Sequence, residues 1–309
     1  MEKAACYGIK KYWTQKTLFC ILSGMRYCGR EFTDGDIQLL QRIMKDNAGI
    51  NRYQLSIKFC EEAGWRKADG GLKDMSCRVA LLRMQRDGHI SLPAPQKPHN
   101  KPGAKRTLFA LPQPEVNNKA GEHVLQLQLV EKADSALWNE YNEYIDRYHY
   151  LGYTPLPGAQ LRYFVKSGTQ ILALLGFGAA AWKTAPRDSY IDWDAGTRKR
   201  NLHLIVNNAR FLILPWVRSR NLASKILSMV SRRIVADWQQ KYNYEPVLLE
   251  TFVEKARFQG TCYKAANWIY VGDTQGRGKL DVHNEYKLPV KGIYLYPLRK
   301  DFRKRLIEG

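Results

Sequence analysis

The sequence predicts an α+β protein in which an N-terminal group of helices precedes a mixed β-sheet with helices on both faces. Residues 33–93 have the apolar spacing of helices, whereas residues 124–271 alternate short apolar runs with helical segments. Within the second part, a strand, a basic turn and a helix follow one another over residues 209–241. A chain of 309 residues, 45% of them hydrophobic, is long enough to build two separate cores.

Three helices are expected in the N-terminal part. The first begins at Thr33 or Asp34, which are good N-cap residues, the second spans residues 51–63, and the third spans residues 73–87. The side chains of the third helix that are expected to face inward are Val79, Leu82 and Met84.

Two short strands, at residues 89–92 and 107–111, are expected to pair as a wing behind these helices. Three helices and such a wing form a winged helix-turn-helix, whose third helix enters the major groove while the wing meets phosphate. The DNA contacts expected here are Lys73, Arg78, Arg83 and Arg86 on the helix, and Lys105 and Arg106 on the wing. A winged helix also serves as a protein-interaction module, and this alternative stays open.

The composition places a linker at residues 112–121, between a first domain at 1–111 and a second at 122–309. Strands of the second domain are expected at residues 124–130, 161–165, 171–177, 201–214, 247–252 and 268–271. Helices are expected at residues 136–147 and 222–241, near Tyr263, and in a basic tail at 299–305.

A basic turn, residues 218–221, stands directly before the predicted helix at 222–241. The first turn of a helix presents free backbone N–H groups and the positive end of its dipole, so it attracts anions. With Arg218 and Arg220 beside it, this turn predicts a site for a phosphate-bearing ligand.

The charge of the chain points to a polyanionic partner. The formal net charge is +20, and residues 196–233 hold nine Lys or Arg with no Asp or Glu. DNA, duplex or single-stranded, is therefore the expected partner. The further DNA contacts expected in the second domain are Arg198, Lys199, Arg200, Arg257, Lys264, Arg277 and Lys279.

No apolar run approaches the roughly 20 residues that cross a bilayer, so we expect a cytoplasmic protein without a membrane partner. The six cysteines form no Cys-x-x-Cys pair, which argues against a structural zinc site.

The basic turn resembles the pyrophosphate loop of GNAT-type acetyltransferases, in which Arg or Gln is followed, after two residues, by Gly, one residue, and Gly or Ala. Residues 218–223 fit this pattern with Asn221 in place of glycine and Ala223 at its end. Asparagine tolerates left-handed backbone better than other non-glycine residues. The same family has a Tyr ahead of a Gly-Phe pair on the next helix, and Tyr263 precedes Asn267 and Trp268 in the same way.

Four ordered motifs resemble the Mom branch of that fold, phage enzymes that modify adenine in DNA. They are His149-Tyr-Leu-Gly152, Arg220-Asn-Leu-Ala-Ser224, Glu254 after the strand at 249–253, and Gly260-Thr-Cys-Tyr-Lys-Ala265. Over nearly its whole length the chain resembles the DruA family, named for a component of the Druantia anti-phage system and similar to proteins that accompany transposases. The resemblances imply a GNAT-like, Mom-like second domain in a defence protein.

The candidate catalytic residues are His149, Tyr150, Glu250, Glu254 and Tyr263, and the candidate cofactor-binding residues are Arg218, Arg220, Asn221, Ala223 and Ser224. Histidine titrates near neutrality, so His149 is a candidate general base or metal ligand, or else a structural histidine. Glu250 is expected either to orient an amine or a metal or to pair with an arginine of the basic segment. Tyr263 either protonates a leaving group or is a core tyrosine with a satisfied hydroxyl.

The expected function is a DNA-binding protein of anti-phage defence whose second domain modifies or senses DNA, possession of an enzyme activity being left open. One alternative is a catalytically silent factor that recruits other defence proteins or a transposase. Another is an acyl-CoA-dependent N-acetyltransferase, against which both the charge and Asn221 argue. An acyl-CoA-like ligand and a metal ion are the cofactors considered.

Overall fold

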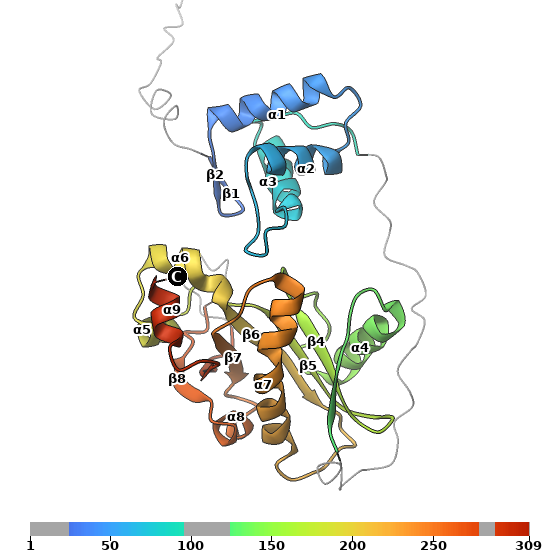
Figure 1. Ribbon diagram of the computed structural model, residues 1–309, viewed down its shortest axis with the longest axis vertical. Coiled ribbons are helices and arrows are strands. Elements are labelled where there is room, and N and C mark those ends of the chain that lie inside the picture. Colours follow the sequence, from blue (N-terminus) through green and yellow to red (C-terminus); the bar gives the residue numbers. More distant parts are fainter. Residues whose placement is uncertain (1–24, 96–123, 278–287, 309) are drawn as a thin grey trace, which may run out of the picture. The chain divides into compact units, whose positions relative to one another are not determined.

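The computed structural model describes residues 25–95, 124–277 and 288–308, and Figure 1 shows the arrangement of their helices and strands. The chain divides into two compact units, the first up to Gly103 and the second from Ala104. The predicted linker at 112–121 lies outside the described residues, so the domain boundaries stay a prediction.

The first unit consists of a short hairpin and three helices. Its elements are β1 (Met25–Tyr27), β2 (Arg30–Phe32), α1 (Asp34–Asp46), α2 (Arg52–Glu62) and α3 (Asp74–Arg86). Thr33 and Asn51 begin α1 and α2 with capping boxes. In each box the side chain of the first residue accepts the backbone N–H of the residue three positions later, whose own side chain accepts the backbone N–H of the first residue. The three predicted helices are therefore confirmed.

The wing is not shown. Residues 89–92 form no strand, and the second predicted strand at 107–111 lies outside the described residues, as do Lys105 and Arg106. The two-stranded sheet that the first unit does contain is the antiparallel β1–β2 hairpin, which precedes the helices. Three residues per strand are too few for an alternation pattern to reveal it.

The inward face of α3 differs from the prediction. Met84 is fully buried, but Val79 and Leu82 are 39% and 48% exposed. The buried residues of the helix are Cys77, Ala80, Leu81 and Met84, which are spaced as one helical face. Val79 and Leu82 lie outside that face, and the expectation that they point inward was wrong.

The second unit is built on one mixed seven-stranded sheet in the order β3-β4-β5-β6-β7-β9-β8. The strands are β3 (Gln126–Leu129), β4 (Leu161–Ser167), β5 (Gln170–Ala179), β6 (Ile205–Ile213), β7 (Leu248–Glu254), β8 (Ile269–Asp273) and β9 (Lys291–Pro297). The helices are α4 (Ser135–Tyr148), α5 (Ala185–Ile191), α6 (Ala195–Asn201), α7 (Leu222–Tyr242), α8 (Thr261–Ala265) and α9 (Phe302–Glu308), with a 3-10 turn at Leu202–Leu204. The predicted α+β class with a mixed sheet is thus confirmed.

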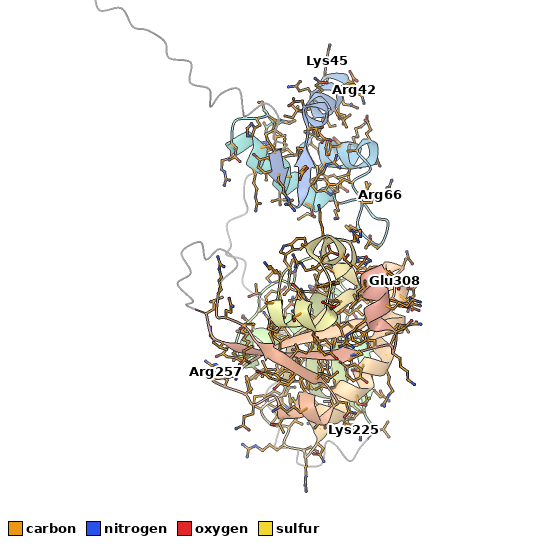
Figure 2. All side chains as sticks on the ribbon, turned by 90° about the vertical axis from the view of Figure 1, so that its left-hand side faces the viewer. Arg42, Lys45, Arg66, Lys225, Arg257 and Glu308 are labelled. Carbon is orange, nitrogen blue, oxygen red and sulfur yellow. The ribbon has the colours of Figure 1, made fainter. Side chains whose placement is uncertain are left out.

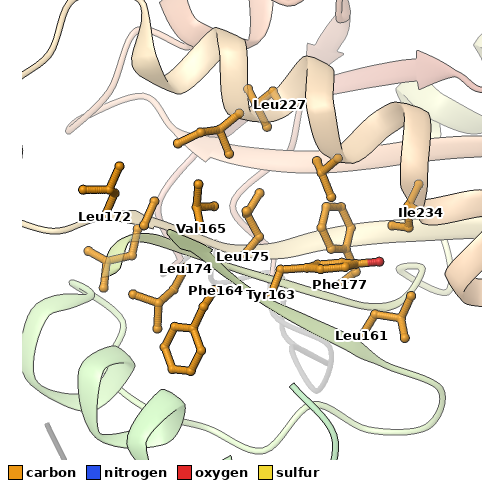
Figure 3. Packing of buried hydrophobic residues seen from close by; sticks show 14 of the residues in the cluster. Leu161, Tyr163, Phe164, Val165, Leu172, Leu174, Leu175, Phe177, Leu227 and Ile234 are labelled. Carbon is orange, nitrogen blue, oxygen red and sulfur yellow. The ribbon is translucent and has the colours of Figure 1, made fainter. Parts of the chain in front are cut away.

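Helices cover both faces of this sheet. Successive residues of β4 point to opposite faces and so pack against different helices. Tyr163 donates its hydroxyl hydrogen to Asp237 of α7 at 2.9 Å, whereas Phe164 packs edge-on against Tyr141 of α4. Figure 3 shows Val165 and Phe164 on opposite sides of the same strand, directed toward α7 and α4 respectively. The main core of the unit is therefore divided into two layers by the sheet.

The sheet opens between β6 and β7. These two strands run parallel and pair over only three positions, Ile205–Asn207 with Leu248–Glu250. Beyond them β6 continues along β5, while β7 continues along β9. The carboxyl-terminal halves of β6 and β7 consequently diverge and leave a wedge in the sheet.

No helix in the described part of the chain is long and apolar enough to cross a membrane.

Candidate functional site

A cavity of about 650 Å³ occupies the wedge between β6 and β7. Its walls come from residues 207–213 of β6, residues 251–253 of β7, residues 148–151 after α4, and residues 258–263 around α8. Ala223 in the first turn of α7 and Lys291 of β9 complete the lining. The volume is that of a typical small-molecule site.

A β-bulge shapes the β6 wall. The register between β5 and β6 shifts where Gly176 faces Arg210 and Phe177 faces Asn208, so Ala209 is the extra residue. Bulges re-aim side chains and are frequent beside functional sites. Arg210 Nη1 donates to the Ala209 carbonyl oxygen at 2.8 Å, and burial lowers the pKa of this guanidinium.

Arg210 is one of the cavity residues that the sequence did not single out, and Phe258 is another. The only signal was one arginine inside the apolar run at 209–214, which was interpreted as part of a long basic segment. The structure places it in the cavity wall.

His149 lies in the cavity wall at the end of α4, as its C-cap, and is 9% exposed. Its Nδ1 accepts the backbone N–H of Leu151 at 3.2 Å, which leaves Nε2 as the protonated nitrogen of the neutral ring. Burial, and then the charge of Arg210, lower the pKa of His149 to about 4. This pKa lies below the near-neutral value of an ordinary histidine, and the ring is suited to donate a hydrogen bond from Nε2.

Two exposed aromatic side chains stand among the lining residues. Tyr150 and Phe258 are 38% and 50% exposed and pack edge-on with their ring centroids 5.5 Å apart. The guanidinium of Arg257 lies 5.2 Å from the Tyr150 ring centroid, and Figure 2 shows its side chain projecting from the surface of the second unit. Arg257 Nε also binds the Glu254 carboxylate at 3.0 Å.

Neither predicted glutamate lines the cavity. Glu250 is fully buried on the opposite side of β7 from Thr251, where its Oε2 lies 2.8 Å from Nη1 of Arg187 and its Oε1 accepts the N–H of Ala181 at 2.7 Å. Burial raises the pKa of Glu250, and the charge of Arg187 opposes that rise. Glu250 thus pairs with an arginine, as the alternative to a catalytic role predicted. That arginine is Arg187, which precedes the basic segment at 196–233. Glu254 is likewise committed to an ion pair, with Arg257.

Tyr263 lines the cavity and is 7% exposed. Its hydroxyl donates to Asn208 Oδ1 at 2.9 Å and accepts from Thr251 Oγ1 at 3.4 Å, while burial raises its pKa. The hydroxyl is satisfied, which agrees with the structural alternative for this residue.

The predicted phosphate turn leads into the cavity at the first turn of α7. Asn221 has φ 58° and no side-chain cap begins the helix, while Ser224 Oγ donates to the Asn221 carbonyl oxygen. Arg218 and Arg220 are exposed. Asn267, the other asparagine at a position where the resemblance predicts glycine, has φ 62°. Both asparagines therefore adopt the left-handed backbone for which glycine is usual.

The predicted DNA contacts of the second unit do not form one group. Arg198 is 12% exposed at its side chain and pairs with Asp188 at 3.1 Å, so it is not a free surface cation. Lys199 and Arg200 are exposed on α6, before the start of β6 and thus at the opposite end of that strand from the wedge. Lys264 and Arg277 are exposed, and Lys279 lies outside the described residues.

The predicted contacts on α3 also differ from one another. Arg83 and Arg86 are exposed, although Arg86 pairs with Asp87, and Lys73 is half-buried before the helix. Arg78 pairs with Asp74 at 3.1 Å and lies over the Tyr53 ring. Nowhere in residues 25–95, 124–277 or 288–308 do three His, Cys, Asp or Glu side chains gather in a way that would hold a metal ion.

Gly260 provides the first prediction. It lines the cavity at φ 69°, and a Cβ there would overlap the Tyr294 ring. Gly260→Ala is expected to lower the free energy of unfolding by at least about 1 kcal/mol more than Gly168→Ala, because Gly168 has a similar φ of 57° with open space around it. Chemical denaturation of both variants measures the difference, and equal losses would show that the Tyr294 contact is unimportant.

Comparison with known proteins identifies one family. The family described as Druantia protein DruA matches residues 83–285. No curated protein matches the chain.

Several solved acetyltransferases are similar to part of it. An N-acetyltransferase from Staphylococcus aureus Mu50 is 14% identical, with 57% of this chain and 99% of that chain covered and a TM-score of 0.35. A GNAT-family acetyltransferase from Streptococcus pneumoniae is 14% identical, with coverages of 56% and 99% and a TM-score of 0.36. The ribosomal-protein-S18-alanine N-acetyltransferase from Escherichia coli is 7% identical, with coverages of 57% and 94% and a TM-score of 0.34.

Proposed function

This chain belongs to the family of the Druantia protein DruA, and from that premise we propose that it binds DNA in anti-phage defence and holds a nucleotide of that DNA in the cavity between β6 and β7. The observation that carries the proposal is the cavity itself, which combines a cationic wall at Arg210 with exposed aromatic rings at Tyr150 and Phe258. In this function the GNAT-like second unit modifies or senses DNA.

The distribution of charge supports DNA binding by the second unit. Residues 25–95 hold twelve Lys or Arg against nine Asp or Glu, whereas residues 124–309 hold 28 against 17. Both parts are therefore basic, with net charges of +3 over 71 residues and +11 over 186 residues. Such an excess attracts a phosphate backbone and makes binding sensitive to salt. Contacts between α3 of the first unit and DNA are a separate proposal.

The exposed aromatic pair supports the capture of a base. Enzymes that act on a DNA base take it out of the stack and hold it against aromatic side chains. Stacking on an aromatic ring is worth about 1–3 kcal/mol per base and does not depend on sequence. Tyr150 and Phe258 offer such rings without rearrangement of the core, because both are already exposed.

Two observations favour other functions. The left-handed Asn221 and the uncapped first turn of α7 beside the cavity favour a phosphate-bearing cofactor, so an acyl-CoA-dependent N-acetyltransferase is the second candidate. A catalytically silent protein that recruits defence enzymes or a transposase is favoured by the partners that the candidate catalytic groups already have within the chain. These groups are His149 Nδ1, Glu250, Glu254 and the Tyr263 hydroxyl.

Gel-shift titrations of the full chain with duplex, single-stranded and forked DNA test the binding. If six or more phosphates are contacted, affinity is expected to fall about a thousandfold between 50 and 200 mM salt. Absence of DNA binding at low salt would overturn the proposed function.

Mass spectrometry of the nucleosides recovered afterwards then separates the candidates: a new base mass supports modification, and unaltered nucleosides support sensing or recruitment. Labelled acetyl-CoA tests the acetyltransferase.

The aromatic pair has its own test. Tyr150→Leu with Phe258→Leu is expected to weaken single-stranded DNA binding about tenfold, since one stacked base is lost. Trp182→Leu is the matched control, because Trp182 is 54% exposed and does not line the cavity. An equal loss in both proteins would show that the cavity aromatics hold no base.

A further inference from the structure

Arg210 differs from the other arginines that are poorly exposed in the second unit. Arg187 is bound by Glu250 and Asp188, and Arg198 is bound by Asp188. Arg162 donates to Gln160 and Asn142 and lies against the Trp138 ring. Arg210 has no carboxylate partner in the described part of the chain, and the one hydrogen bond of its guanidinium there runs from Nη1 to the Ala209 carbonyl oxygen.

The unoccupied edge of this guanidinium is the one formed by Nε and Nη2. Arg210 Nε is inaccessible to solvent and has no hydrogen-bond partner among the described residues. A covered N–H of a charged group that lacks a partner is costly, because its hydration is lost without replacement. Nη2 is not covered in this way, so it is the N–H group of the guanidinium that a phosphate or carboxylate oxygen can reach.

The cavity supplies no anion of its own. Its lining residues include Arg210 and Lys291 but no Asp or Glu. The groups that interact electrostatically with Arg210 are Tyr141, His149 and Tyr150, none of which carries a negative charge near neutral pH. No described residue supplies a counter-charge for Arg210, and a bound anion would supply one.

We propose that Arg210 is the anion anchor of the cavity and binds the phosphate group of a nucleotide through Nη2. The proposal rests on the proposed function, from which it takes the nucleotide. The bulge at Ala209 holds the guanidinium by its opposite side, so the free edge is oriented before the ligand arrives. The base of the same nucleotide lies against the aromatic rings at the cavity, and His149 Nε2–H is a further neutral donor.

A site built in this way costs stability while it is empty, since functional groups are often retained at the expense of the fold. Arg210→Met keeps the aliphatic part of the side chain and removes the charge. The variant is therefore expected to be at least as stable as the natural protein without ligand. An arginine with a structural role would instead destabilise the fold when replaced.

The experiment compares deoxyadenosine 5′-monophosphate with deoxyadenosine by calorimetric titration of the full chain. The phosphate is expected to increase affinity about 10- to 100-fold in the natural protein, as a charge-assisted pair does. Arg210→Met is expected to abolish that difference, and Arg210→Lys to retain part of it. Arg232→Met is the control, because Arg232 is exposed on α7 and does not line the cavity.

A phosphate preference that survives in Arg210→Met, or no preference in the natural protein, would overturn this assignment. Loss of unfolding free energy in unliganded Arg210→Met would also contradict it. DNA binding measured by gel shift separates the two proposals. A natural protein that binds DNA but shows no effect of Arg210 on nucleotide binding refutes the anchor alone, whereas one that binds no DNA refutes the proposed function.

Discussion

Glu250→Ala is expected to lower the free energy of unfolding by about 3–5 kcal/mol, because it leaves a buried guanidinium without its main counter-charge. Glu250 and Arg187 have no exposed side-chain surface, and their pair is 2.8 Å long. The change also removes the acceptor for the Ala181 N–H. Denaturant unfolding followed by circular dichroism measures the loss.

Two further variants separate structure from catalysis at this pair. Glu250→Gln keeps the shape and one acceptor, so its loss should be smaller than that of the alanine variant. Replacing both partners together, Arg187→Met with Glu250→Leu, should recover part of the stability, because both fully buried charges are gone while Asp188, which loses Arg187, still pairs with Arg198. If Glu250→Ala unfolded like the natural protein yet lost defence activity, Glu250 would return as a catalytic candidate.

A second large effect is expected from His149 as the pH falls. Its pKa of about 4 in the folded protein lies below the ordinary value of 6.5, so the neutral ring stabilises the fold fully above pH 6.5. That contribution is lost as the pH falls from 6.5 toward 4, because the unfolded chain binds the proton first. At about 1.4 kcal/mol per pKa unit, the natural protein should lose about 3 kcal/mol through this group.

His149→Gln removes the titration and should flatten the pH dependence of unfolding by about that amount between pH 7 and pH 4. His203→Gln is the control, because His203 is an exposed histidine of the same unit. Identical pH profiles for the natural protein and His149→Gln would contradict the buried, neutral state of the ring.

Local patterns predicted most elements because the apolar residues of a helix or strand recur in the sequence at the spacing typical of that element. Leu222, Ile226, Val230 and Ile234 follow the helical period and are all buried in α7. The predicted strands of the sheet also occur, but the first four residues of the strand predicted at 201–214 were wrong, because Asn201 ends α6 and Leu202–Leu204 form a 3-10 turn. Short elements escaped: α5 and α6 have seven residues each, which is too few for a periodic signal.

The strand β9 was not predicted, and its position in the sheet could not have been predicted from local patterns. It follows β8 in the sequence but is inserted between β7 and β8 in the sheet. Strand order depends on long-range pairing, which no local pattern records. The same limit explains the glutamates, since only the fold brings Arg187 to Glu250 from 63 positions away.

The candidate site was predicted in part. His149, Tyr150, Tyr263 and Ala223 come from four separate segments and all line one cavity. Residue types did not reveal their state: neither the low pKa of His149 nor the occupied hydroxyl of Tyr263 follows from the sequence, because both depend on what surrounds them. That no described carboxylate lies beside Arg210 is likewise a property of the assembled cavity.

The short seam between β6 and β7 makes the seven-stranded sheet two hydrogen-bonded ladders rather than one. β3 to β6 form one ladder and β7, β9 and β8 the other, joined by pairing over three positions and by side chains packed under α7. Side-chain packing yields to small sliding movements more readily than a backbone ladder does. The two ladders are therefore natural units of cooperative opening, and their amide protons should exchange with different protection. A ligand that contacts both β6 and β7 would hold the two ladders together.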